Sequence, residues 1–199
     1  MWPPADTIVH DDVELRFELT GVGWANLEFR IGDQSIRIDW FSDLENSFHE
    51  VAFAALSAAS SGGQGFYRFA LNGEPMEWRW TVNSLFRQGY GYYSHVLVEE
   101  FPDDNHMWVD NEGRYWPRSK PNPGRLVFSA FCSSDSFAKA VRTAYEPLEE
   151  MGAEQFEDKW GLNPFPVRTL AALDAALLTP RRWSDPKPLH GARYVIAKK

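Results

Sequence analysis

Apolar and polar side chains alternate along much of the first forty residues, with the period of two that is typical of half-buried strands. The alternation covers VELRFEL at 13–19, WANLEFRI at 24–31 and SIRIDW at 35–40, and it places Trp40 on the same face as Ile38. Short glycine-containing segments separate the first two runs and the last two. Because such short connections join antiparallel neighbours, the pattern predicts a three-stranded meander.

A helical period follows the meander. The S-x-x-E sequence from Ser42 to Glu45 predicts a capping box at the start of a helix. The apolar face of this helix consists of Leu44, Phe48, Val51, Ala52, Ala55 and Leu56. The glycine-rich sequence SSGGQG then predicts a loop.

Two further alternating runs predict a hairpin. FYRFAL at 66–71 and MEWRWTV at 76–82 flank Asn72–Gly73, a pair that is favoured in tight turns. Along the second run the tryptophans share one face, while Glu77 and Arg79 share the other.

The strand after this hairpin is apolar on both faces, which predicts a central position in the sheet for YYSHVLVEE at 92–100. RLVFSAF at 125–131 has a similar buried character. Helical patterns then dominate. One helix begins at Ser134 or Asp135 and ends near Pro147, and others cover 154–160 and 167–178.

The order of these elements predicts an α+β fold, with an antiparallel sheet of meander and hairpin, helices packed on one face, and a helical C-terminal third. We expect a single domain over residues 1–199. It consists of a sheet-rich part at 1–132, a helical part at 133–180 and a basic tail at 181–199. The run at 125–131 favours one domain, because it needs strand partners from earlier in the chain.

Charge is unevenly distributed along the chain, whose formal net charge is −8. Residues 1–112 carry 19 acidic and 6 basic side chains, a net charge of −13, whereas residues 113–199 carry a net charge of +5. The acidic part disfavours nucleic acid as a partner, because phosphates are neutralised by lysine and arginine. It favours a basic protein partner, although an acidic surface also serves solubility alone.

The compartment is predicted from what the sequence lacks. No apolar run approaches the roughly 20 residues of a membrane span. The N-terminus has no basic and apolar segments of a secretory signal. The single cysteine, Cys132, allows no internal disulfide. These features predict a cytoplasmic protein that does not bind a membrane.

The candidate functional segment lies between the last two predicted strands, at 99–124. It mixes carboxylates with large aromatic side chains, a composition that suits protein recognition because the rings anchor and the charges steer. The candidate partner-binding residues are Glu99, Glu100, Asp103, Asp104, His106, Trp108, Asp110, Tyr115 and Trp116.

Other interpretations of this segment stay open. Its spacing is not that of an EF-hand, because Met107, Trp108 and Val109 stand where oxygen donors are needed. A looser Ca²⁺ or Mg²⁺ site would suit a metal-assisted hydrolase that uses the acids with His106 or His95. A homodimer through the segment or through a strand edge is a third interpretation. We predict no cofactor and no metal.

Nucleophilic catalysis finds little support in the sequence. Cys132 lies where a strand meets a helix, but no motif pairs it with a histidine, so we expect a buried structural cysteine. Neither phosphate-binding glycine loops nor a G-x-S-x-G sequence occur.

Residues 13–82 resemble a family of small uncharacterised bacterial proteins. The resemblance rests on FELTGVGWANLEFRIGDQ, SDLENSFHEVAFAAL and EPMEWRW, and it implies no activity. In size, acidity and lack of catalytic motifs the whole chain is similar to immunity proteins of bacterial toxin systems. We therefore expect a non-enzymatic binding protein, possibly an immunity-type inhibitor of a basic toxin.

Overall fold

The computed structural model of the chain describes residues 7–60, 65–87, 91–102, 107–109, 115–117, 124–161 and 163–179. Its elements in chain order are β1 (Val13–Gly21), β2 (Trp24–Ile31), β3 (Gln34–Ser42), α1 (Ser47–Ala59), β4 (Gly65–Gly73), β5 (Met76–Arg87), β6 (Gly91–Phe101), β7 (Met107–Val109), β8 (Tyr115–Pro117), β9 (Arg125–Ser133), α2 (Ser134–Ala144), α3 (Glu146–Met151), α4 (Ala153–Trp160) and α5 (Val167–Leu178). This order confirms the predicted α+β fold with a helical C-terminal part.

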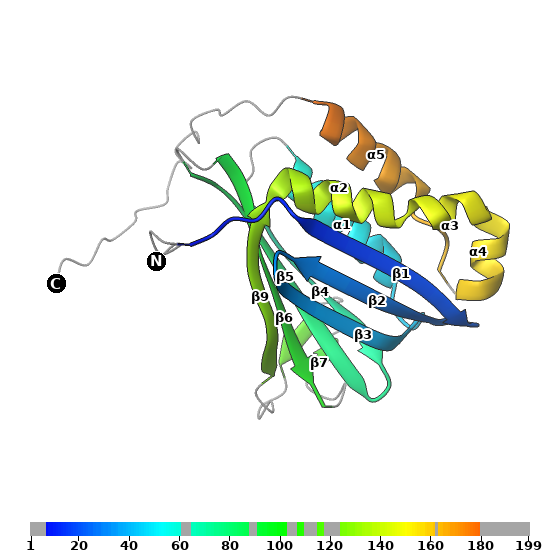
Figure 1. The fold of residues 1–199 in the computed structure, drawn as a ribbon. Helices are drawn as coiled ribbons and strands as arrows, with labels where there is room; N and C mark the ends of the chain where they lie inside the picture. The colour runs from blue at the N-terminus through cyan, green and yellow to red at the C-terminus, as the bar shows by residue number, and fades with distance from the viewer. Residues whose placement is uncertain are drawn as a thin grey trace.

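The meander and the hairpin belong to two separate sheets. Strands β1, β2 and β3 form a three-stranded antiparallel sheet, and a four-stranded antiparallel sheet has the order β4-β5-β6-β9. Figure 1 shows the three-stranded sheet crossing the four-stranded one, with α1, α2 and α5 above it. Strand β6 lies between β5 and β9, which confirms its predicted central position.

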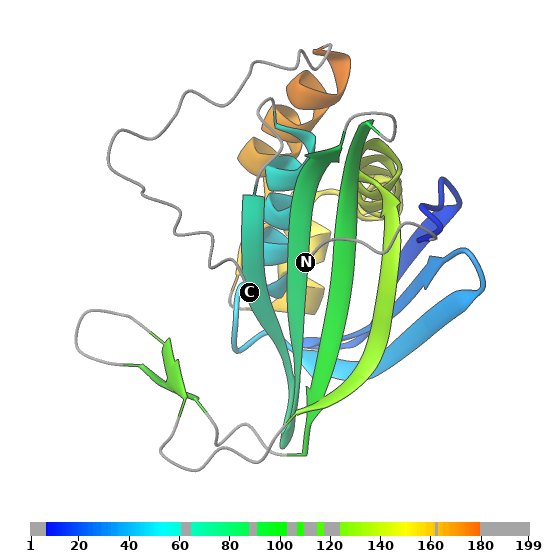
Figure 2. The same cartoon turned by 90° about the vertical axis from the view of Figure 1, so that its left-hand side faces the viewer.

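One face of the four-stranded sheet carries the core. Figure 2 shows the helices and the three-stranded sheet behind this sheet, and no other element among the described residues covers its near face. Phe29 of β2 joins the two sheets, because its ring centroid lies 5.2 Å from those of Trp80 and Phe128. Phe48 of α1 packs edge-on against Trp160, at 4.6 Å, and so joins the helices to this core.

Helix α1 begins later than the predicted capping box. Ser42 belongs to β3, and the N-cap is Asn46, whose side chain makes no capping hydrogen bond. Glu45 accepts a hydrogen bond from the side chain of Asn72 instead, at 3.1 Å. This contact with β4 holds the carboxyl group away from the helix end, and burial raises its pKa.

The turn between β4 and β5 also differs from the prediction. Asn72 and Gly73 are the last residues of β4, paired with Glu77 and Met76, and the chain reverses at Glu74–Pro75. A Cβ atom at Gly73 would lie 2.5 Å from the ring of Trp78. Glycine is therefore required here by the close approach of an indole rather than by the turn.

Helices α2, α4 and α5 follow the predicted boundaries closely, whereas α3 was not predicted. The cap of α2 is Ser133, one residue before the predicted start, and its hydroxyl accepts a hydrogen bond from the backbone N–H of Ser136. Helix α2 ends before Pro147, which lies in the first turn of α3. No helix of the described residues is long and apolar enough to cross a membrane. The predicted basic tail lies outside the described residues.

A β-bulge in β3 overturns the predicted orientation of Trp40. The pairing of β2 and β3 shifts between Ala25 and Leu27, so that the single residue Asn26 faces both Asp39 and Trp40. Ile38 and Phe41 are then the buried side chains, and Trp40 is 63% exposed. The extra residue reverses the alternation, because each step along a strand changes the face.

Asn26 holds this bulge in place. Trp40 has a φ of 64°, which is rare for a bulky side chain and costs about 1–2 kcal/mol. The backbone N–H of Trp40 donates to Oδ1 of Asn26, and Nδ2 of Asn26 donates to the carboxylate of Glu18, both at 3.0 Å. The buried amide thus links all three strands of the sheet.

We expect Asn26→Ala to lower the free energy of unfolding by about 1–3 kcal/mol, because it removes both hydrogen bonds and leaves a backbone N–H unsatisfied. Urea denaturation measures the change. Ser35→Ala, at an exposed position of the same sheet, is the control and should have little effect. Equal stability of the two variants would contradict the role given to Asn26.

Candidate functional site

The predicted partner-binding residues fall into three groups in the structure. Glu99 and Glu100 belong to β6 and directly precede its last residue, Phe101. Trp108 belongs to β7, and Tyr115 and Trp116 belong to β8. The four remaining predicted residues lie outside the described residues; they are Asp103, Asp104, His106 and Asp110.

Strands β7 and β8 form a two-stranded antiparallel ribbon where the sequence predicted only a loop. Their register pairs Met107 with Pro117, Trp108 with Trp116, and Val109 with Tyr115. Figure 2 shows this ribbon beyond the end of the four-stranded sheet and apart from the helices. The pairing therefore brings the backbones of Trp108, Tyr115 and Trp116 together, beyond the end of the four-stranded sheet.

The base of the segment is held by Phe101 and Gly124. Phe101 is the last residue of β6 and is 5% exposed, and Gly124 directly precedes β9. A Cβ atom at Gly124 would overlap the Phe101 ring, so glycine is what allows the two ends to approach. Since β6 and β9 are paired neighbours, this contact closes the segment at the sheet.

Arg79 also packs against Phe101. Its guanidinium lies 4.0 Å from the ring centroid, a cation–π geometry. Its Nε donates to the carboxylate of Glu77, and only 12% and 5% of these two side chains are exposed. Nη2 of Arg79 is buried and has no hydrogen-bond partner within the part of the chain that the structure describes.

Sequence reasoning missed this pair as part of the site. Glu77 and Arg79 were expected to lie together on the polar face of β5, and they do, but the face is buried at this end. The register sets Glu77 opposite Phe101 and Arg79 opposite Glu99. The sequence signal that could have found this pair is the opposite charge of Glu77 and Arg79, two residues apart on one face of a predicted strand.

Glu100 already has an ionic partner within the chain. Its carboxylate accepts a hydrogen bond from Arg125 of β9 at 2.7 Å. The Arg125 side chain is largely exposed, so the pair adds little to stability. It does offset part of the negative charge that the sequence assigned to this position.

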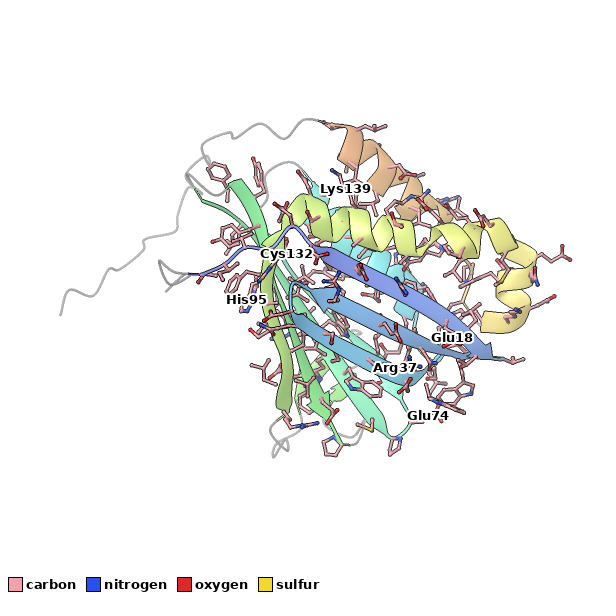
Figure 3. The ribbon with its side chains drawn as sticks, in the orientation of Figure 1. Glu18, Arg37, Glu74, His95, Cys132 and Lys139 are labelled. Carbon is pink, nitrogen blue, oxygen red and sulfur yellow. The ribbon has the colours of Figure 1, made fainter. Side chains whose placement is uncertain are left out.

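His95 lies on the face of the four-stranded sheet opposite the core (Figure 3). Its Nε2 and the hydroxyl of Ser129 are 2.9 Å apart, and its ring stacks on Phe131 with centroids 4.0 Å apart. Burial lowers the pKa of His95, which keeps the imidazole neutral at pH 7. These contacts fit a histidine that is satisfied within a strand.

Cys132 is fully buried, and burial raises the pKa of its thiol. The thiol therefore stays protonated at neutral pH, and it is not a nucleophile in this fold. Among the described residues no three histidine, cysteine or acidic side chains gather as metal ligands.

Comparisons with protein-family models, curated proteins and solved structures find no match to this chain.

We expect Gly124→Ala to lower the free energy of unfolding by about 1–3 kcal/mol, because the added methyl group forces the Phe101 ring from its place. Thermal or urea unfolding measures this. Gly21→Ala is the matched control, since a Cβ atom at Gly21 meets nothing within 4 Å. Similar stability of Gly124→Ala and the wild type would contradict the proposed closure.

The lowered pKa of His95 also predicts a pH dependence. The unfolded chain binds the proton more readily, so the contribution of neutral His95 is present above its ordinary pKa of 6.5 and is lost as the pH falls below it. His95→Gln keeps a hydrogen-bonding group for Ser129 but does not titrate. We expect the wild type to lose more stability than His95→Gln between about pH 7.5 and pH 5. Parallel losses in urea denaturation would contradict this.

Proposed function

We propose that this chain is a non-enzymatic protein-binding protein that contacts a basic partner through residues 99–116. Its most concrete form is an immunity-type inhibitor of a basic bacterial toxin, acting in the cytoplasm. One observation carries the proposal. Strands β7 and β8, which carry Trp108, Tyr115 and Trp116, pair as a ribbon that lies beyond the end of the four-stranded sheet.

The closed base supports this proposal energetically. Phe101, Gly124 and Arg79 fix where the segment leaves the sheet, so part of the entropy of ordering it is lost on folding rather than on binding. A rigid base with an aromatic ribbon is a suitable arrangement for anchoring a partner. The paired backbones at Trp108 and Trp116 place two of the three predicted anchors at one level of the ribbon.

Electrostatics supports a basic partner. The net charge of −13 over residues 1–112 accelerates encounter with a positive surface. In this proposal Glu99, Asp103, Asp104 and Asp110 pair with lysine or arginine of the partner, while Glu100 keeps its bond to Arg125. Trp108, Tyr115 and Trp116 supply the buried contacts.

The test is capture of a partner from cells of the source organism, followed by measured affinity. We expect the combined substitution Trp108→Ala and Asp103→Ala to weaken binding about 30-fold or more, because it removes an anchor and a steering charge. Raising the salt concentration should slow association more than it speeds dissociation.

The matched control combines Leu178→Ala with Glu154→Ala, which removes an exposed apolar side chain and an exposed acid from helices instead of the ribbon. It should bind as the wild type does. Recovery of no protein partner, or unchanged affinity of the ribbon variant, would overturn the proposal.

Two measurements separate the proposal from its alternatives. Thermal unfolding with added Ca²⁺, Mg²⁺, Mn²⁺ or Zn²⁺ should show no increase, whereas a metal-assisted hydrolase would be stabilised by its ion. Light scattering at two protein concentrations should give the mass of a monomer. A mass that doubles with concentration would favour the homodimer instead.

A further inference from the structure

Trp40 stands apart from the other tryptophans whose side chains the structure describes. Trp78, Trp80 and Trp160 are buried and Trp24 is half-buried, whereas Trp40 is 63% exposed. Burying an indole is among the largest single contributions a side chain makes to a core. The neighbouring Phe41 is fully buried, so β3 places one aromatic residue inside and the preceding one outside.

The bulge is what turns Trp40 outward. Without the extra residue, strict alternation from Ile38 would place Trp40 in the core. Bulges occur where a strand must aim one side chain away from the regular pattern, often beside functional sites. The positive φ of Trp40 costs free energy only in the folded state. The hydrogen bond from the Trp40 N–H to the buried Asn26 amide holds this conformation.

The surface around Trp40 is acidic. Near Trp40 the outer face of the three-stranded sheet carries Glu18, Glu28 and Asp39 with Arg37, while Asp12, Glu14 and Arg30 lie toward its other end. Arg37 contacts all three of the carboxylates near Trp40, so two negative charges remain in excess there. Figure 3 shows Glu18 and Arg37 on this sheet, with the exposed Glu74 at the same end.

This surface lies at the same end of the molecule as the base of the ribbon. A Cβ atom at Gly73 would lie 3.2 Å from the carbonyl oxygen of Trp40, so Trp40 adjoins the turn between β4 and β5. Just beyond that turn, Glu77 pairs with Phe101, where β6 ends and the ribbon segment begins. Trp40 and the point where the ribbon segment begins thus lie at the same end of the molecule.

We propose that Trp40, with the carboxylates of Glu18 and Asp39, binds an arginine or lysine side chain of a basic protein partner. An exposed indole attracts a cation over its face, and carboxylates beside it complete the recognition of a guanidinium. This inference rests on the proposed function and adds a second contact to it. Charge complementarity selects a basic segment over a second copy of this acidic chain.

The test uses the full chain labelled with 5-fluorotryptophan and fluorine NMR. The probe is a synthetic peptide of alternating arginine and glycine, and a glutamate–glycine peptide of equal length is the control. The Trp40 resonance is assigned by its absence from Trp40→Gly. We expect this resonance to shift saturably with the arginine peptide only, and the shift to weaken severalfold in higher salt.

Trp40→Gly also separates binding from folding. Glycine adopts a positive φ without strain, so this variant should unfold at the same or a higher temperature than the wild type. It should bind the arginine peptide at least about fivefold more weakly, as judged from the other resonances. Leu178→Ala, which removes a side chain that is 85% exposed on α5, should match the wild type.

Three outcomes of the peptide titrations would overturn the inference. These are an unmoved Trp40 resonance, an equal response to the glutamate peptide, and unchanged affinity of Trp40→Gly. A shift that depends on protein concentration without peptide would also overturn it, in favour of a second copy as the occupant. The proposed function is judged separately, by partner capture with the ribbon variant, so the two can fail independently.

Discussion

Aromatic rings packed between the two sheets are the interaction on which the rest of the structure depends. Phe29 lies against Trp80 and Phe128 of the four-stranded sheet, so the two sheets share one apolar centre. Phe48 contacts Phe41 of β3 and extends this centre into the helical part through Tyr145, Phe156 and Trp160. Because ring pairs prefer tilted and edge-on geometries, these contacts set the angle between layers as well as holding them.

The residues proposed for binding lie outside this dense centre. Helices and the three-stranded sheet occupy one side of β4, β5, β6 and β9, and the ends of these strands are where the chain is free to extend outward. Both surfaces proposed for binding lie at one such end. Each is supported from beneath by a buried polar group, Arg79 in one case and Asn26 in the other.

The sequence predicted the parts of the fold that depend on periodicity. The strands of the two larger sheets, the central position of β6 and helices α2, α4 and α5 follow from patterns of two or 3.6 residues. Features that depend on contacts distant in sequence were missed. The predicted capping box failed because Glu45 bonds to Asn72, and the predicted turn failed because Gly73 is needed beneath Trp78.

The candidate site shows the same division. Composition identified the acidic and aromatic segment, but it could not reveal that β7 and β8 pair or that Arg79 lies over Phe101. Trp40 was assigned to the core because a bulge adds one residue without leaving a mark in the hydrophobic pattern. Asn26 faces two residues of β3, and this can be seen only once the two strands are paired.

The contact between Phe101 and Gly124 separates the evolution of recognition from the evolution of the scaffold. Because the entropy of closing a loop rises only slowly with its length, residues between these two can be inserted, deleted or exchanged at small cost to folding. Lineages that keep this ring and this glycine are then free to vary everything between them. The sequence between these two residues can therefore change while the sheet that carries it stays the same.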